Sequence, residues 1–89
     1  MKYKQLTKYR KGQTVILLNG EGFGAKVGAT AFVTGRVKSI YGYNVEYVKL
    51  VWDRKNKFYG NQSDGGYFDK AFGLLYNDIP EGIDEVIVE

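Results

Sequence analysis

Residues 30–52 read TAFVTGRVKSIYGYNVEYVKLVW, and this stretch decides the fold class. Apolar and polar side chains alternate with a period of two on both sides of Tyr41-Gly42-Tyr43-Asn44, where Gly42 can adopt the positive φ of a tight turn. The pattern predicts a hairpin of two strands, 30–40 and 45–52. The first strand places Ala31, Val33, Gly35 and Val37 on one face, and Phe32, Thr34, Arg36 and Lys38 on the other. The second places Val45, Tyr47, Lys49 and Val51 opposite Glu46, Val48, Leu50 and Trp52, with Trp52 buried.

Shorter strand patterns lie on either side of this hairpin. They are Gln13–Leu18, a possible start at Phe58-Tyr59, Gly66–Phe72 after a turn at Asp64-Gly65, and Ile83–Val88, which reads as a final strand or an acidic tail. Residues 69–76 have the spacing of one helical turn. We therefore expect one all-β domain over residues 1–89. It would be a small barrel or roll of five to six antiparallel strands with at most one short helical turn.

The composition excludes several kinds of site. The 89 residues include no cysteine and no histidine, which excludes disulfides, the usual zinc sites, thiol catalysis and histidine acid–base chemistry. The acidic residues lack the spacing of a calcium loop. The polar start MKYKQLTKYRK lacks the apolar core of a signal peptide, and no apolar run approaches the ~18 residues of a membrane span. We expect a cytoplasmic protein that is not an enzyme and that has no metal, no cofactor and no membrane partner.

Charge is distributed unevenly along the chain. Residues 1–60 contain 12 Lys and Arg against 3 acids, a local +9, and residues 61–89 contain 1 base against 7 acids, a local −6. Five of these seven acids lie in the C-terminal segment 77–89. Such asymmetry is typical of a surface that steers a charged partner, or of an acidic segment that pairs with a basic face of the same molecule.

A glycine-rich stretch, Val15–Gly28 (VILLNGEGFGAKVG), has the spacing of a nucleotide loop at Gly20, Gly22 and Ala25. A dinucleotide site also needs a helix after the glycines, whose N-terminus binds the phosphates. The residues that follow are β-branched and glycine-rich and predict a strand. The glycines therefore indicate a long first loop of a small β-domain, with Phe23 held among them.

The same glycines carry a resemblance to a known fold. Gly12-Gln13-Thr14-Val15, Gly22-Phe23-Gly24 and Gly28 resemble the opening of SH3-like and KOW-type barrels, and Val51-Trp52-Asp53 and Gly65-Gly66-Tyr67 resemble their middle. The resemblance covers roughly residues 10–76 and implies an SH3-like barrel. Short proteins of this style are common in bacteriophage genomes, which would place the protein in the cytoplasm of a host cell.

Aromatic and basic residues are interleaved along the predicted surface. Aromatic rings supply binding area at low entropy cost, and cations favour an acidic partner. Packing of tyrosines on a small core is the alternative explanation, and we prefer it for Tyr47 and Trp52. The candidate partner-binding residues are Phe23, Lys26, Phe32, Arg36, Lys38, Tyr41, Tyr43, Tyr59 and Tyr67.

Three binding functions fit this sequence. The first is a small phage-type inhibitor or adaptor that binds a host protein through an aromatic and basic face. The second is a KOW-like module that binds nucleic acid through the basic N-terminal half. The third is capture of a small ligand or nucleotide at an interface between subunits. The sequence leaves the oligomeric state open.

Overall fold

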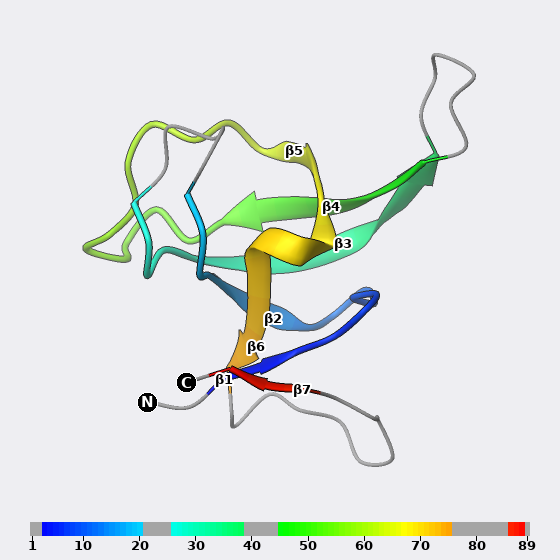
Figure 1. The fold of residues 1–89 in the computed structure, drawn as a ribbon. Coiled ribbons are helices and arrows are strands. Elements are labelled where there is room, and N and C mark those ends of the chain that lie inside the picture. The colour runs from blue at the N-terminus through cyan, green and yellow to red at the C-terminus, as the bar shows by residue number, and fades with distance from the viewer. Residues whose placement is uncertain (1–2, 21–25, 39–44, 76–85, 89) are drawn as a thin grey trace.

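In the computed structural model, the chain forms one antiparallel β-sheet with a short 3-10 helix (Figure 1). The structure describes residues 3–20, 26–38, 45–75 and 86–88. The strands are β1 (Tyr3–Gln5), β2 (Thr14–Leu17), β3 (Thr30–Lys38), β4 (Glu46–Trp52), β5 (Gly65–Tyr67), β6 (Phe72–Leu75) and β7 (Val86–Val88), and the helix is η1 (Asp69–Ala71). No helix in these ranges is long and apolar enough to cross a membrane.

The sheet order is β5-β4-β3-β2-β6-β1-β7, and each neighbouring pair is antiparallel. The predictions of an all-β fold and of one short helical turn are confirmed. The sheet has seven strands rather than five to six. Its end strands β5 and β7 do not pair with each other in the described ranges, so the sheet is open and closure into a barrel is not confirmed.

The predictions for β2, β3 and β4 hold within a residue or two, but four others differ. The strand predicted over Gly66–Phe72 is wrong, because β5 ends at Tyr67, η1 covers Asp69–Ala71 and β6 begins at Phe72. Phe58 and Tyr59 lie in the loop between β4 and β5 rather than in a strand, and Gly65 begins β5 instead of forming a turn. The short polar strand β1 was not predicted. It forms because it lies between β6 and β7, two strands from the other end of the chain. The predicted turn at residues 41–44 lies outside the described residues.

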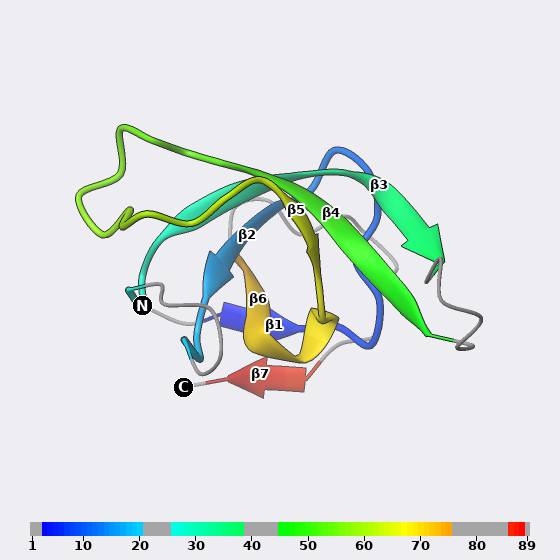
Figure 2. The same ribbon diagram turned by 90° about the horizontal axis from the view of Figure 1, so that it is seen from above.

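Aromatic rings from three strands meet in the core. Seen from above, the β3–β4 ribbon crosses over the layer that contains β2, β6 and β1 (Figure 2). Trp52 on β4 is buried, as predicted, with 3% of its surface exposed. The centroid of its ring lies 5.5 Å from that of the Tyr67 ring and 5.9 Å from that of the Phe72 ring. Burial of these large rings supplies much of the hydrophobic stabilisation available to a domain of this size.

A β-bulge in β3 reverses the predicted alternation of its second half. Val33 pairs with Leu50, but Gly35 pairs with Lys49, so two steps along β3 match one step along β4. Arg36 then pairs with the buried residue Val48 and lies on the face that carries the core. The prediction that Arg36 and Lys38 share a face with Phe32 is therefore wrong, because the extra residue moves them to the opposite face.

Candidate functional site

The face of the β3–β4 ribbon that points away from the core is rich in exposed apolar side chains. Phe32 pairs with Val51, and Val37 pairs with Tyr47. The Tyr47 ring packs against the Phe68 ring, and the two ring centroids are 5.0 Å apart. We define the outer sheet face as Phe32, Val37, Tyr47, Lys49, Val51 and Phe68. The exposed fractions are 52% for Phe32, 43% for Val51, 43% for Phe68 and 39% for Val37, which is unusual for neighbouring apolar residues on a sheet.

The charge on the outer sheet face is positive. Lys49 is exposed near the middle of the face, and the Lys70 ammonium lies 5.8 Å from the centroid of the Phe68 ring. β3 and β4, both fully described, contain one acidic residue, Glu46, and it lies on the opposite face. An acidic or mixed apolar and acidic surface would complement this face.

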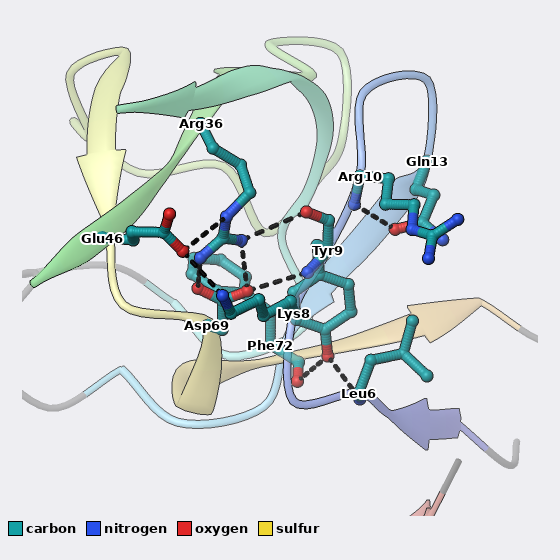
Figure 3. A network of polar contacts seen from close by, with 9 residues as sticks. All are labelled: Leu6, Lys8, Tyr9, Arg10, Gln13, Arg36, Glu46, Asp69 and Phe72. Carbon is teal, nitrogen blue, oxygen red and sulfur yellow. Dashed lines mark hydrogen bonds and ion pairs between the residues drawn. The ribbon is translucent and has the colours of Figure 1, made fainter. Parts of the chain in front are cut away.

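The inner face beyond the bulge is polar, and its centre is Arg36 (Figure 3). The Arg36 guanidinium donates through Nη1 to Asp69 Oδ2 at 2.7 Å and through Nη2 to Asp69 Oδ1 at 3.0 Å. Nη1 also donates to the Tyr9 carbonyl at 3.1 Å, and Asp69 Oδ2 accepts from the Tyr9 backbone N–H at 2.8 Å. This paired geometry raises the pKa of Arg36, chiefly through its hydrogen bonds to Asp69.

An open polar cleft of about 510 Å³ adjoins this ion pair. We call it the Arg36 cleft, and it is lined by Thr7, Lys8, Arg36, Lys38, Val45, Glu46 and Asp69. Lys8 Nζ lies 2.9 Å from Glu46 Oε2, and Arg36 Nε lies 3.7 Å from the same oxygen. The pKa of Glu46 is lowered, first by the hydrogen bond from Lys8 and then by the charges of Lys8, Arg36 and Lys38.

Tyr9 stands between the basic residues Lys8 and Arg10 in the sequence, but it does not lie on a basic surface. Its side chain is fully buried, and its hydroxyl donates to the Phe72 carbonyl and accepts from the Leu6 backbone N–H. Burial disfavours the phenolate and raises the pKa of Tyr9 to about 12. Tyr9 is therefore a core residue that joins the segment after β1 to β6.

Two predicted binding tyrosines pack against the core. Tyr67 accepts a hydrogen bond from Trp52 Nε1 at 3.3 Å and donates to the Ser63 carbonyl. Tyr59 accepts from Arg54 Nη1 and donates to the Gln62 carbonyl at 3.0 Å. Both rings are half-buried, as the alternative explanation for tyrosines on a small core describes.

The remaining predicted residues are distributed over different parts of the chain. Phe32 lies on the outer sheet face, Lys38 lines the Arg36 cleft, and Lys26 is exposed before β3. Phe23, Tyr41 and Tyr43 lie outside the described residues. The described members thus do not form the single aromatic and basic face that the sequence predicted.

Five residues of the outer sheet face were not among the predicted site residues: Val37, Tyr47, Lys49, Val51 and Phe68. A signal for three of them was present, because the predicted outward face of β4 already contained Tyr47, Lys49 and Val51. The preference for Tyr47 as a core residue is wrong, because Tyr47 pairs with the exposed Val37 and its ring packs against Phe68. Val37 could not be placed without the bulge. Phe68 follows β5 and reaches Tyr47 through a tertiary contact.

A second basic surface lies in the loop between β4 and β5. Arg54, Lys55 and Lys57 are exposed there, and the Lys57 ammonium lies 4.9 Å from the centroid of the Phe58 ring. The Asp53 side chain accepts from the Lys55 backbone N–H at 3.0 Å. The side-chain oxygen of Asn56 accepts from the Phe58 backbone N–H at 2.7 Å. These local hydrogen bonds fix the loop backbone and present its cations in a defined arrangement.

The end of the glycine-rich stretch packs against this loop. Gly28 has φ +103°, and a Cβ atom there would lie 2.9 Å from Phe58 Cδ2. Gly28 is thus required by both its backbone conformation and its contact with a ring. Residues 21–25 lie outside the described ranges.

No group of three or more His, Cys, Asp or Glu side chains able to hold a metal ion occurs in the part of the chain that the structure describes. Comparison of the chain with models of protein families, with curated proteins and with solved structures finds no match. The resemblance to SH3-like and KOW-type barrels therefore stays a prediction.

Proposed function

We propose that the protein is a non-catalytic binding module, a small inhibitor or adaptor, that binds another protein through the outer sheet face. The supporting observation is the run of exposed Phe32, Val51, Val37 and Phe68 side chains on one side of the β3–β4 ribbon. Buried aromatic anchors dominate the affinity of protein interfaces, and a sheet held by core packing on its other side presents them at low entropy cost. Lys49 and Lys70 favour a partner with acidic groups around an apolar patch.

Capture from a nuclease-treated lysate of the natural host, followed by mass spectrometry, tests this proposal. The wild-type protein is expected to retain a specific protein, and Phe32→Ala is expected to weaken its binding by at least about tenfold, the loss of a typical hot spot. Phe58→Ala is the matched control, because Phe58 is 41% exposed but lies in the β4–β5 loop. Equal retention by Phe32→Ala and the wild type, at equal stability, would contradict the proposed surface.

Nucleic-acid binding is the second candidate, and the β4–β5 loop is what supports it. Lys55 and Lys57 are exposed in this loop, and the Lys57 ammonium lies over the exposed ring of Phe58, a combination that suits phosphates and an unstacked base. Arg54 adds a third cation, which is paired with Asp64. This function predicts binding to a single-stranded oligonucleotide that weakens steeply with salt. Lys55→Gln should lower the slope of log affinity against log salt concentration by the amount that corresponds to about one phosphate contact. Phe32→Ala should leave this slope unchanged. Binding that is independent of salt would exclude it.

A further inference from the structure

The Arg36 cleft brings three cations to one small volume. Lys8, Arg36 and Lys38 line it together with two carboxylates, Glu46 and Asp69. Asp69 already accepts from both terminal nitrogens of Arg36, which leaves Glu46 as the counter-ion that faces Lys8 and Lys38. The volume of about 510 Å³ lies within the range of roughly 300–1,000 Å³ for small-molecule sites, and its polar lining suits a polar ligand.

One donor in this cleft lacks a hydrogen bond. Arg36 Nε is buried and has no hydrogen-bond partner, and the nearest carboxylate oxygen, Glu46 Oε2, is 3.7 Å away. A charged N–H that is buried and unpaired is unfavourable, so an additional oxygen acceptor at this position would stabilise the protein. The other guanidinium nitrogens are held by Asp69 and the Tyr9 carbonyl, which fix the direction of the Nε–H bond.

The Glu46 carboxylate is bound weakly enough for another anion to take its place beside Lys8. Its close contact is with Lys8 at 2.9 Å, and the exposed fractions of these side chains are 67% for Lys8 and 35% for Glu46. Exposed pairs of this kind contribute little to stability and rearrange readily. The lowered pKa of Glu46 arises from Lys8, Arg36 and Lys38 together, so all three cations favour negative charge at one position.

We propose that the Arg36 cleft binds the phosphate group of a small phosphorylated molecule, at the position that the Glu46 carboxylate occupies in this structure. A tetrahedral phosphate can accept from Arg36 Nε–H and from the ammonium groups of Lys8 and Lys38 in three directions, whereas a planar carboxylate offers two oxygens. The cleft lies on the opposite face of the ribbon from the outer sheet face. This site is therefore separate from the proposed protein interface.

A titration of the ¹⁵N-labelled wild-type protein with inorganic phosphate, glycerol 3-phosphate and acetate tests the proposal by NMR. The chain has three arginines, Arg10, Arg36 and Arg54, so the Arg36 Nε–H signal can be assigned and followed directly. We expect this signal to move and saturate with both phosphate compounds. Glycerol 3-phosphate should bind more tightly than inorganic phosphate, because the cleft has room for the rest of the molecule, and acetate should bind most weakly.

Three variants separate specific binding from general charge attraction. Glu46→Gln removes the competing carboxylate and should tighten phosphate binding by roughly fivefold. Lys8→Gln should weaken it by a similar factor. Lys11→Gln makes the same change of charge at an exposed lysine that does not line the cleft, and it should leave phosphate binding unchanged.

Several results would overturn the proposal. They are an Arg36 Nε–H signal that does not saturate with either phosphate compound, acetate binding as tight as phosphate binding, and an equal loss of phosphate binding in Lys8→Gln and Lys11→Gln. Tighter binding of inorganic phosphate than of glycerol 3-phosphate would overturn the assignment to a phosphorylated molecule and assign the cleft to the free ion. None of these results depends on capture of a protein partner.

Discussion

The two faces of the β3–β4 ribbon depart from the usual distribution of side chains in opposite ways. On the outer sheet face, Phe32, Val37 and Val51 are exposed to solvent, while the inner face buries the ion pair of Arg36 and Asp69, whose side chains are 22% and 10% exposed. Apolar side chains in water and charges in the interior each carry a cost. The inner face compensates that cost with paired hydrogen bonds, whereas the outer face has no such compensation within the described residues, which is why it suits a partner.

The largest expected difference between the faces is in stability. Trp52→Ala removes a buried inner-face ring that contacts Tyr67 and Phe72, and it should lower the free energy of unfolding by ~3–5 kcal/mol. Phe32→Ala removes a half-exposed outer-face ring and should change it by less than about 0.5 kcal/mol. Urea denaturation of both variants measures the contrast. Similar losses for both would show that the two faces are equally buried.

A smaller loss should follow when the ion pair is broken. Asp69→Asn keeps the shape of the side chain but leaves the Arg36 charge without its partner. We expect the free energy of unfolding to fall by about 3 kcal/mol. This value is at the lower end of the range for breaking a buried ion pair, because Arg36 is partly exposed. Lys8→Gln breaks the exposed pair with Glu46 in the same cleft and should leave the urea midpoint unchanged. An Asp69→Asn variant with wild-type stability would show that the pair is solvated.

The smallest effect is expected at Tyr9 and depends on pH. Tyr9→Phe leaves the Phe72 carbonyl and the Leu6 N–H without a partner and should cost about 1 kcal/mol at neutral pH. In the wild type, the pKa of Tyr9 is raised from 10.0 to about 12 by burial. The folded state holds this proton more tightly than the unfolded state, so the stabilisation is complete below pH 10 and is lost as the pH rises to about 12.

Urea midpoints measured between pH 7 and pH 12 check this prediction. The difference between the wild type and Tyr9→Phe should shrink above pH 10. A constant difference for Tyr9→Phe would show that Tyr9 does not keep its proton at high pH.

The sequence predicted one strand of the ribbon well and half of the other. In β4, a clean alternation from Glu46 to Trp52 gave the correct faces. In β3, the same reasoning placed Val33 correctly and failed at Arg36, because one extra residue changes the face of everything after it. Gly35 was the available signal, since a glycine inside a strand often marks a bulge.

The polar cluster could not be predicted, because its members are far apart in the chain. Asp69 is 33 residues from Arg36 and 60 residues from Tyr9, and no local pattern relates them. Tyr9 lies beside Lys8, Arg10 and Lys11 in the sequence, and these charged neighbours give no sign that its side chain is buried. The sequence therefore indicated the residue types of the candidate site but not which of them the fold uses to stabilise itself.

The position of β1 has a consequence for how the protein is made. β2 to β5 pair with strands next to them in the chain and can form early, but Tyr3–Gln5 pairs with β6 and β7, and Tyr3 meets Leu75 and Val88. At a synthesis rate of ~5–20 residues per second, the ribosome needs roughly 4–14 s to add the ~70 residues that separate β1 from β6. During that time β1 lacks both strands with which it pairs, so its polar residues help to keep the nascent chain from aggregating.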